Sequence, residues 1–141
     1  MTESPRRRPS GRWPFLLPVA YMGLVLALSS IPGTPQPDEP ESYALFRWVP
    51  PRLQNLLHLP EYALLAWLWC RALGASDGLS GPARLAVAAV VSIAFAFIDE
   101  AYQMTIPGRY ASLTDLLLNT IGVAGGIWIH RAYRRRSAEA R

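Results

Sequence analysis

Side chains that could bind a ligand or move a proton are concentrated in a few short segments of an otherwise apolar sequence. They are, in chain order, His58, Tyr62, Glu100, Gln103, Arg109, Asp115 and Asn119. His58, Glu100 and Asp115 are the candidate catalytic residues, because imidazole and carboxyl groups are the usual general acids and bases of proteins. The other four are candidate substrate-binding residues, since a guanidinium can hold an anionic group while amides and a phenol orient it.

Four long apolar runs must position these side chains. The first has nineteen residues, and at about 1.5 Å per helical residue it approaches the roughly 30 Å hydrocarbon core of a bilayer. The third is short unless its helix continues to Met104. The sequence therefore predicts an all-α, polytopic membrane protein with a bundle of four transmembrane helices. The runs are Trp13 to Ile31, Leu53 to Leu73, Ala83 to Ile98 and Leu113 to His130.

A different interpretation of the first run is a cleaved signal peptide. Three consecutive arginines precede the run, and the small residues Ala27 and Ser29 lie near its end. The run is long for the apolar part of a signal peptide, which favours a membrane-spanning helix.

The arginines predict the orientation of the bundle. Residues 1–12 and 131–141 form basic tails of net charge +3 and +4, and residues 13–130, the predicted transmembrane domain, carry −3. With the amino terminus in the cytoplasm, eleven arginines lie inside and three outside, which satisfies the positive-inside rule with both termini cytoplasmic. We therefore expect a multi-pass protein of the bacterial plasma membrane that contacts membrane lipids through its tails.

Two function classes are excluded by composition. The basic clusters adjoin apolar runs rather than a groove-reading element, so no nucleic-acid partner is expected. The single cysteine, Cys70, rules out a disulfide-stabilised scaffold.

In this orientation every polar residue of the spans lies near the outer face. Asp115, Asn119, Gly122 and Gly126 fall within about 60° of one another on a helix, so two hydrogen-bonding groups precede two glycines on one face. Three helices can thus present polar groups to one shared, outward-facing pocket. Simpler explanations remain for two of these features: Ser112 and Asp115 have the spacing of a capping box, and the glycines suit helix packing.

The predicted pocket has an excess of acids. Four carboxyl groups face one arginine and His58, and charge at membrane depth is costly. Three compensations are open: proton uptake by the acids, a hard divalent cation on the carboxylates, or an ion pair of Arg109 with Glu100 or Asp115. No zinc-binding spacing occurs, so no metal or cofactor is assigned. The acids are Glu61, Asp99, Glu100 and Asp115.

The connection from Pro32 to Pro51 is long for a compact bundle and contains several aromatic residues. We expect it to form a short interfacial helix or cap over the outer ends of the spans.

Three groups of motifs resemble the VanZ family, which is named after a teicoplanin-resistance protein. They are SSIPG at 29–33, HLPEY at 58–62, and a spaced set between Asp99 and Gly126. The residues that match the family pattern are Ser29, Ser30, Pro32, His58, Tyr62, Glu100, Gln103, Pro107, Arg109, Asp115, Asn119 and Gly122.

The resemblance implies a four-helix membrane protein of the cell envelope with a link to glycopeptide resistance, but no reaction. Three functions are consistent with these features. The first is a pocket for a lipid or cell-wall (peptidoglycan) precursor head group. The second is a membrane-embedded hydrolase or transferase acting on a lipid-linked phosphate, and the third is a proton-coupled small transporter. The sequence leaves the oligomeric state and the choice between enzyme and binding protein open.

Overall fold

The computed structural model describes residues 13–33, 51–75 and 78–140. Four α-helices account for most of them, which confirms the predicted all-α class. They are α1 (Trp13–Ser29), α3 (Pro51–Gly74), α4 (Gly81–Gln103) and α5 (Leu113–Glu139). The expected interfacial helix or cap between Pro32 and Pro51 lies outside the described residues and stays a prediction.

Two helix ends differ from those drawn from hydropathy. Helix α4 continues past Ile98 to Gln103, as the short third run required, and ends before Pro107 and Gly108. Helix α5 continues past His130 to Glu139, well into the basic tail. The tail contains no proline or glycine, and its Arg, Ala and Glu residues have high helix propensity, so nothing ends the helix at the edge of the apolar run.

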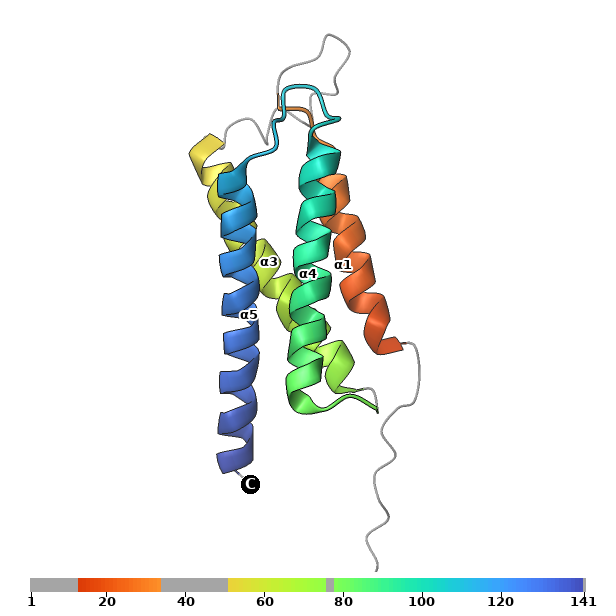
Figure 1. The fold of residues 1–141 in the computed structure, drawn as a ribbon, viewed down its shortest axis with the longest axis vertical. Helices are drawn as coiled ribbons and strands as arrows, with labels where there is room; N and C mark the ends of the chain where they lie inside the picture. Colours follow the sequence, from red (N-terminus) through yellow and green to blue (C-terminus); the bar gives the residue numbers. More distant parts are fainter. Residues whose placement is uncertain (1–12, 34–50, 76–77, 141) are drawn as a thin grey trace, which may run out of the picture.

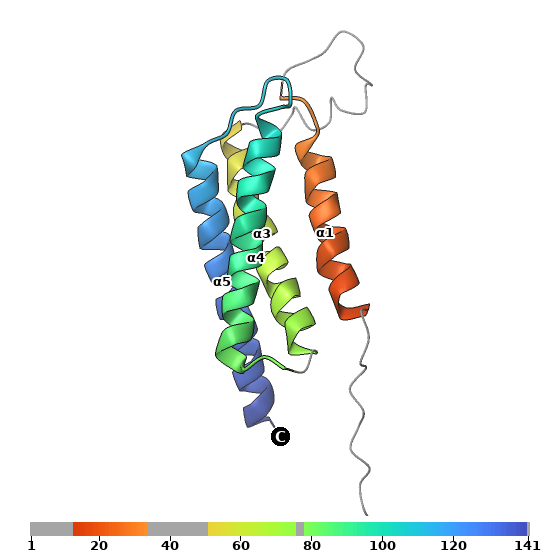
Figure 2. The ribbon, with the colours of Figure 1, turned by 45° about the vertical axis from the view of Figure 1, so that its right-hand side comes forward.

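The helices run roughly along one long axis, with the carboxyl ends of α1 and α4 and the amino ends of α3 and α5 at the same end (Figures 1 and 2). We call this the upper end. The amino end of α4 and the carboxyl ends of α3 and α5 lie at the opposite, lower end (Figure 1). Helix α3 crosses the others obliquely and packs most extensively against α5. Polar residues that are far apart in sequence are therefore brought to one end.

Two glycines allow the close contact between α5 and α3. A Cβ atom at Gly122 would collide with the carbonyl oxygen of Leu59, and one at Gly126 with the carbonyl oxygen of Ala63. Both glycines are buried. The packing interpretation of this glycine pair is confirmed.

Helix α1 is part of the packed bundle. Val25 of α1 is 1% exposed and lies in a core cluster with Tyr62, Leu65 and Phe95. In addition, the hydroxyl of Tyr21 donates a hydrogen bond to the carbonyl oxygen of Glu61 at 3.2 Å. These contacts favour a permanent helix over a cleaved signal peptide.

Much of the lateral surface is apolar. Helix α4 is the one helix in the described ranges that is long and apolar enough to cross a membrane, and only 22% of its most apolar window is buried. Helix α1 is apolar but shorter. Exposed apolar side chains in this number favour an interface with a membrane or another protein. Exposed apolar side chains occur on all four helices, among them Leu17, Leu24, Leu64, Val90, Phe97, Ile98, Leu117 and Ile121.

Candidate functional site

The residues singled out from the sequence converge at the upper end of the bundle. His58 and Tyr62 come from α3, Glu100 and Gln103 from α4, and Asp115 and Asn119 from α5. All six side chains are buried, and Arg109, in the loop between α4 and α5, is half-buried. The grouping of polar residues from three helices is thus present, while the catalytic and substrate-binding roles of these residues stay predictions.

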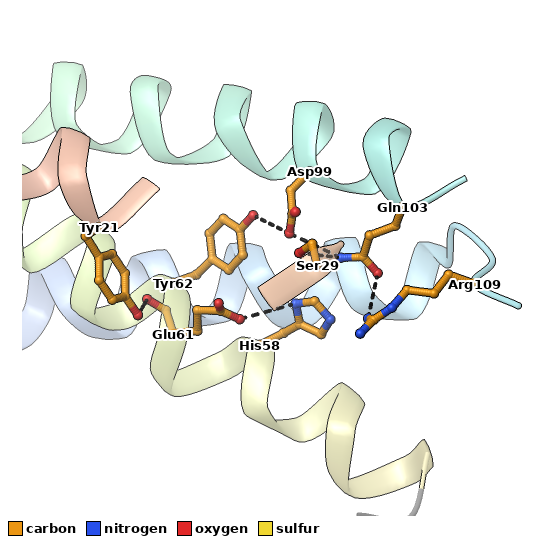
Figure 3. A network of polar contacts seen from close by, with 8 residues as sticks. All are labelled: Tyr21, Ser29, His58, Glu61, Tyr62, Asp99, Gln103 and Arg109. Carbon is orange, nitrogen blue, oxygen red and sulfur yellow. Dashed lines mark hydrogen bonds and ion pairs between the residues drawn. The ribbon is translucent and has the colours of Figure 1, made fainter. Parts of the chain in front are cut away.

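A buried hydrogen-bond network is centred on Asp99 (Figure 3). Its Oδ2 accepts hydrogen bonds from the Tyr62 hydroxyl and from Gln103 Nε2, both at 3.2 Å. Gln103 Nε2 also donates to Ser29 Oγ at 3.3 Å, which adds α1 to the network. Two predicted substrate-binding residues, Tyr62 and Gln103, therefore hold α1, α3 and α4 together.

Arg109 joins the loop after α4 to the end of α1. Its Nε donates to the carbonyl oxygen of Ile31 at 2.8 Å, and its Nη1 donates to Gln103 Oε1 at 3.3 Å (Figure 3). Within the described part of the chain no ion pair joins Arg109 to Glu100 or Asp115, so this one of the three open compensations is not observed. Burial lowers the pKa of Arg109, an effect that the nearby acids, chiefly Asp99, oppose.

The backbone reinforces this junction. The N–H of Gly33 donates to the carbonyl oxygen of Pro107 at 3.0 Å, and a Cβ atom at Gly33 would collide with the carbonyl oxygen of Gly108. Gly108 has a φ of 75°, a conformation that glycine adopts without strain. The glycines of the two motifs SSIPG and PGR are thus needed for one close contact between loops.

Ser112 caps α5, but the predicted capping box does not form. Its Oγ accepts from the Thr114 N–H at 3.1 Å, as an N-cap side chain does. The Ser112 N–H, which a capping box would give to Asp115, donates instead to Glu100 Oε2 at 3.2 Å. Capping therefore does not explain Asp115, whose Oδ1 is buried without a hydrogen-bond partner.

The three candidate catalytic residues lie close together. His58, Glu100 and Asp115 each offer a ligand atom within 4.8 Å of the other two. Buried atoms without a hydrogen-bond partner occur on all three: His58 Nδ1, Glu100 Oε1 and Asp115 Oδ1. His58 Nδ1 lies 3.8 Å from Glu61 Oε2 (Figure 3). We call His58, Glu100 and Asp115 the His-Glu-Asp cluster.

Asn119 lies one helical turn after Asp115 on the same face of α5 and is fully buried. Neither its Oδ1 nor its Nδ2 has a hydrogen-bond partner. A buried amide with both groups unsatisfied costs several kcal/mol, about 1–3 for each group. The site therefore has unused hydrogen-bonding capacity next to the His-Glu-Asp cluster.

The sequence interpretation did not assign site roles to Asp99, Ser29 or the Ile31 carbonyl. Asp99 is the acceptor at the centre of the network, and it was noted only as one of four acids. Ser29 and Ile31 belong to the SSIPG segment, and that motif was the signal that could have placed them in the site.

The lower end of the bundle has the opposite charge. A cleft of about 330 Å³ lies between α3, α4 and the carboxyl-terminal part of α5. Four arginines and a histidine line it together with Cys70: Arg84, Arg131, Arg134, Arg135 and His130. Among the described residues, most acids thus lie at the upper end and most arginines at the lower end.

The family model described as VanZ/LLP1 matches residues 7–134 of the chain. No curated protein and no solved structure matches the chain. The match includes all four described helices up to the last residues of α5, and with them every residue of the site described above. The chain therefore belongs to the VanZ/LLP1 family.

Proposed function

We propose that this VanZ-family chain is a multi-pass protein of the bacterial cytoplasmic membrane, with four spanning helices and both termini in the cytoplasm. The exposed apolar side chains on all four helices support a lipid surrounding. The 27 residues of α5 measure about 40 Å, so the helix can cross the hydrocarbon core and still extend its arginines into the cytoplasm.

The segregation of charge supports the orientation. The arginine-lined cleft lies at the lower end. Positively charged segments of membrane proteins are enriched on the cytoplasmic side, where they can also contact anionic lipid head groups. The buried polar site then lies at the outer side of the membrane. Its ligands would come from the outer leaflet or the cell wall.

Labelling of single cysteines tests this topology. In a Cys70→Ala background, we expect Tyr110→Cys to react with a membrane-impermeant maleimide in right-side-out vesicles, because Tyr110 is 84% exposed in the upper loop. Ser137→Cys, in the last turns of α5, should react only after the vesicles are opened. If only Ser137→Cys is labelled in sealed vesicles, the orientation is the opposite of the proposed one.

We further propose that the upper site binds the phosphate-bearing head group of a lipid or a cell-wall precursor. The observation that carries this proposal is Asn119, a fully buried amide with no hydrogen-bond partner, one helical turn after Asp115 on α5. Buried polar groups are almost always satisfied, so an unsatisfied amide indicates a missing ligand or water. A cell-wall precursor whose head group docks here would be less accessible to a glycopeptide antibiotic. This would account for a link to glycopeptide resistance.

Replacing Asn119 by leucine separates ligand binding from folding. Leucine has a similar size and no polar group to satisfy, so we expect the unliganded protein to unfold at an equal or higher temperature. Any rise in the teicoplanin concentration that cells tolerate when they express the chain should disappear at unchanged protein level. Thr120→Val, at the exposed neighbouring position, is the control and should retain the phenotype. Full resistance in Asn119→Leu would contradict the proposed pocket.

A second candidate function is a membrane-embedded hydrolase or transferase acting on a lipid-linked phosphate. The observation that favours it is the His-Glu-Asp cluster, which places a potential base beside two carboxyl groups. Turnover of polyprenyl phosphates by purified protein, lost in His58→Gln, would support this function. If no turnover is found with or without Mg²⁺, the enzymatic function is excluded and head-group binding is retained.

A further inference from the structure

We propose that His58, Glu100 and Asp115 bind one divalent cation between α3, α4 and α5. This site goes beyond the proposed head-group pocket and does not depend on it, because a cation can occupy the His-Glu-Asp cluster whether or not a lipid binds nearby.

The spacing of the three side chains suits a single ion. Their ligand atoms lie within 4.8 Å of one another, so one point lies within about 2.8 Å of all three. Bonds from Zn²⁺ to histidine nitrogen or carboxylate oxygen measure about 2.0–2.2 Å. A side-chain movement of about 0.6 Å, well within rotamer adjustments, would therefore complete the coordination.

Independent evidence for a ligand comes from buried polar atoms that lack a hydrogen-bond partner. Each member of the cluster is at least nine-tenths buried, and each has a buried polar atom without a hydrogen-bond partner. Most buried polar side chains in proteins are satisfied, so unpartnered atoms on three side chains that meet from three helices indicate a missing ligand or water. A cation would accept lone pairs from Glu100 Oε1, Asp115 Oδ1 and one imidazole nitrogen of His58.

Charge balance supports the same conclusion. Four carboxyl groups lie in this part of the bundle, and Arg109 is bonded to Ile31 and Gln103 rather than to an acid. Burying two carboxylates together without a counter-charge is strongly unfavourable. A divalent cation neutralises Glu100 and Asp115 directly.

The cluster has an outer layer that would orient its ligands. The Ser112 N–H donates to Glu100 Oε2 and leaves Oε1 free to coordinate. Glu61 Oε2 lies 3.8 Å from His58 Nδ1, where a carboxylate can fix the imidazole tautomer that leaves the other nitrogen for the metal. Asn119, one turn from Asp115, can contact a further ligand of the ion. Such supporting groups are typical of functional metal sites.

The donor set narrows the choice of ion. One imidazole nitrogen and two carboxylate oxygens, with no thiolate, suit borderline cations such as Mn²⁺ and Zn²⁺. Mg²⁺ and Ca²⁺ prefer sites made of oxygen alone. We therefore expect Mn²⁺ or Zn²⁺ to bind more tightly than Mg²⁺.

The test is calorimetric titration of the purified, chelator-treated full chain with MnCl₂, ZnCl₂ and MgCl₂ in separate runs. We expect one equivalent of Mn²⁺ or Zn²⁺ per chain, together with a rise in the unfolding temperature, because a ligand that binds only the folded state stabilises it. Asp115→Asn and Glu100→Gln should each weaken binding at least about tenfold. Both variants remove a buried charge and keep side-chain shape, so their metal-free forms should stay folded.

Asp99→Asn is the matched control. Asp99 precedes Glu100 on α4 and is also buried, and its Oδ1 likewise lacks a partner, but it is not one of the three residues whose ligand atoms meet, and its Oδ2 is bonded to Tyr62 and Gln103. It should retain the metal affinity of the unsubstituted chain. The proposal is overturned if neither Mn²⁺ nor Zn²⁺ binds more tightly than about 1 mM, the weak limit of protein cation sites. An equal loss in Asp99→Asn would overturn it too, because the acids would then act only through their total charge.

Discussion

Replacing Gly126 by alanine is expected to destabilise the bundle by about 2–3 kcal/mol, within the range for overpacked interiors. The added Cβ would collide with the carbonyl oxygen of Ala63, which belongs to the backbone of α3 and cannot rotate away. The two helices must therefore separate along their most extensive contact. Gly122→Ala, which would collide with the carbonyl oxygen of Leu59, should have a similar effect.

Gly125→Ala is the control within the same helix. A Cβ at Gly125 would have no atom within 4 Å, so alanine should stabilise the protein by about 1 kcal/mol through its helix propensity. The same chemical change thus has opposite signs at adjacent positions. Unfolding temperatures of the three purified variants in one detergent provide the measurement. Equal stability of Gly125→Ala and Gly126→Ala would show that α3 and α5 are not in close contact.

Loss of the Arg109 guanidinium should have a comparable effect on stability, about 3 kcal/mol for two hydrogen bonds from a charged donor. Arg109→Leu removes the bonds to Ile31 and Gln103, which join the loop after α4 to the end of α1. It also removes a positive charge from the acid-rich end. We expect a lower unfolding temperature and an upper loop that is cleaved more rapidly by protease.

Arg109→Lys distinguishes geometry from charge. Lysine keeps the positive charge but lacks the planar fork that reaches two acceptors in different directions. Its stability should fall between those of the leucine variant and the unsubstituted chain. Arg131→Ala, at the exposed lower end, should change stability by less than about 0.5 kcal/mol. If Arg109→Lys matches the unsubstituted chain, the hydrogen bonds to Ile31 and Gln103 contribute nothing.

The helices could be predicted because their physical causes are local. Apolar runs, the proline and glycine that follow Gln103, and the serine before Leu113 each depend on a few neighbouring residues. The helical spacing of Asp115, Asn119, Gly122 and Gly126 likewise predicted one face, and all four are buried. The extension of α5 to Glu139 was missed because hydropathy marks the end of an apolar segment rather than the end of a helix.

Two contacts of the site could not be predicted because they depend on the course of the loop between α4 and α5. That course brings the Ser112 N–H to Glu100 and so removes it from the capping box with Asp115. It also directs Arg109 to the carbonyl oxygen of Ile31, just after α1, rather than to an acid. In both cases a plausible local pairing is replaced by a partner that only the three-dimensional packing supplies.

The central claim, that the buried polar site at the upper end binds a phosphate-bearing head group, is tested most directly by native mass spectrometry of the chain released gently from its membrane. We predict an additional bound mass that corresponds to a phosphate-bearing lipid or cell-wall precursor and that is absent from Asn119→Leu. Detection of the bare chain alone, or of the same lipids on both proteins, would contradict the claim.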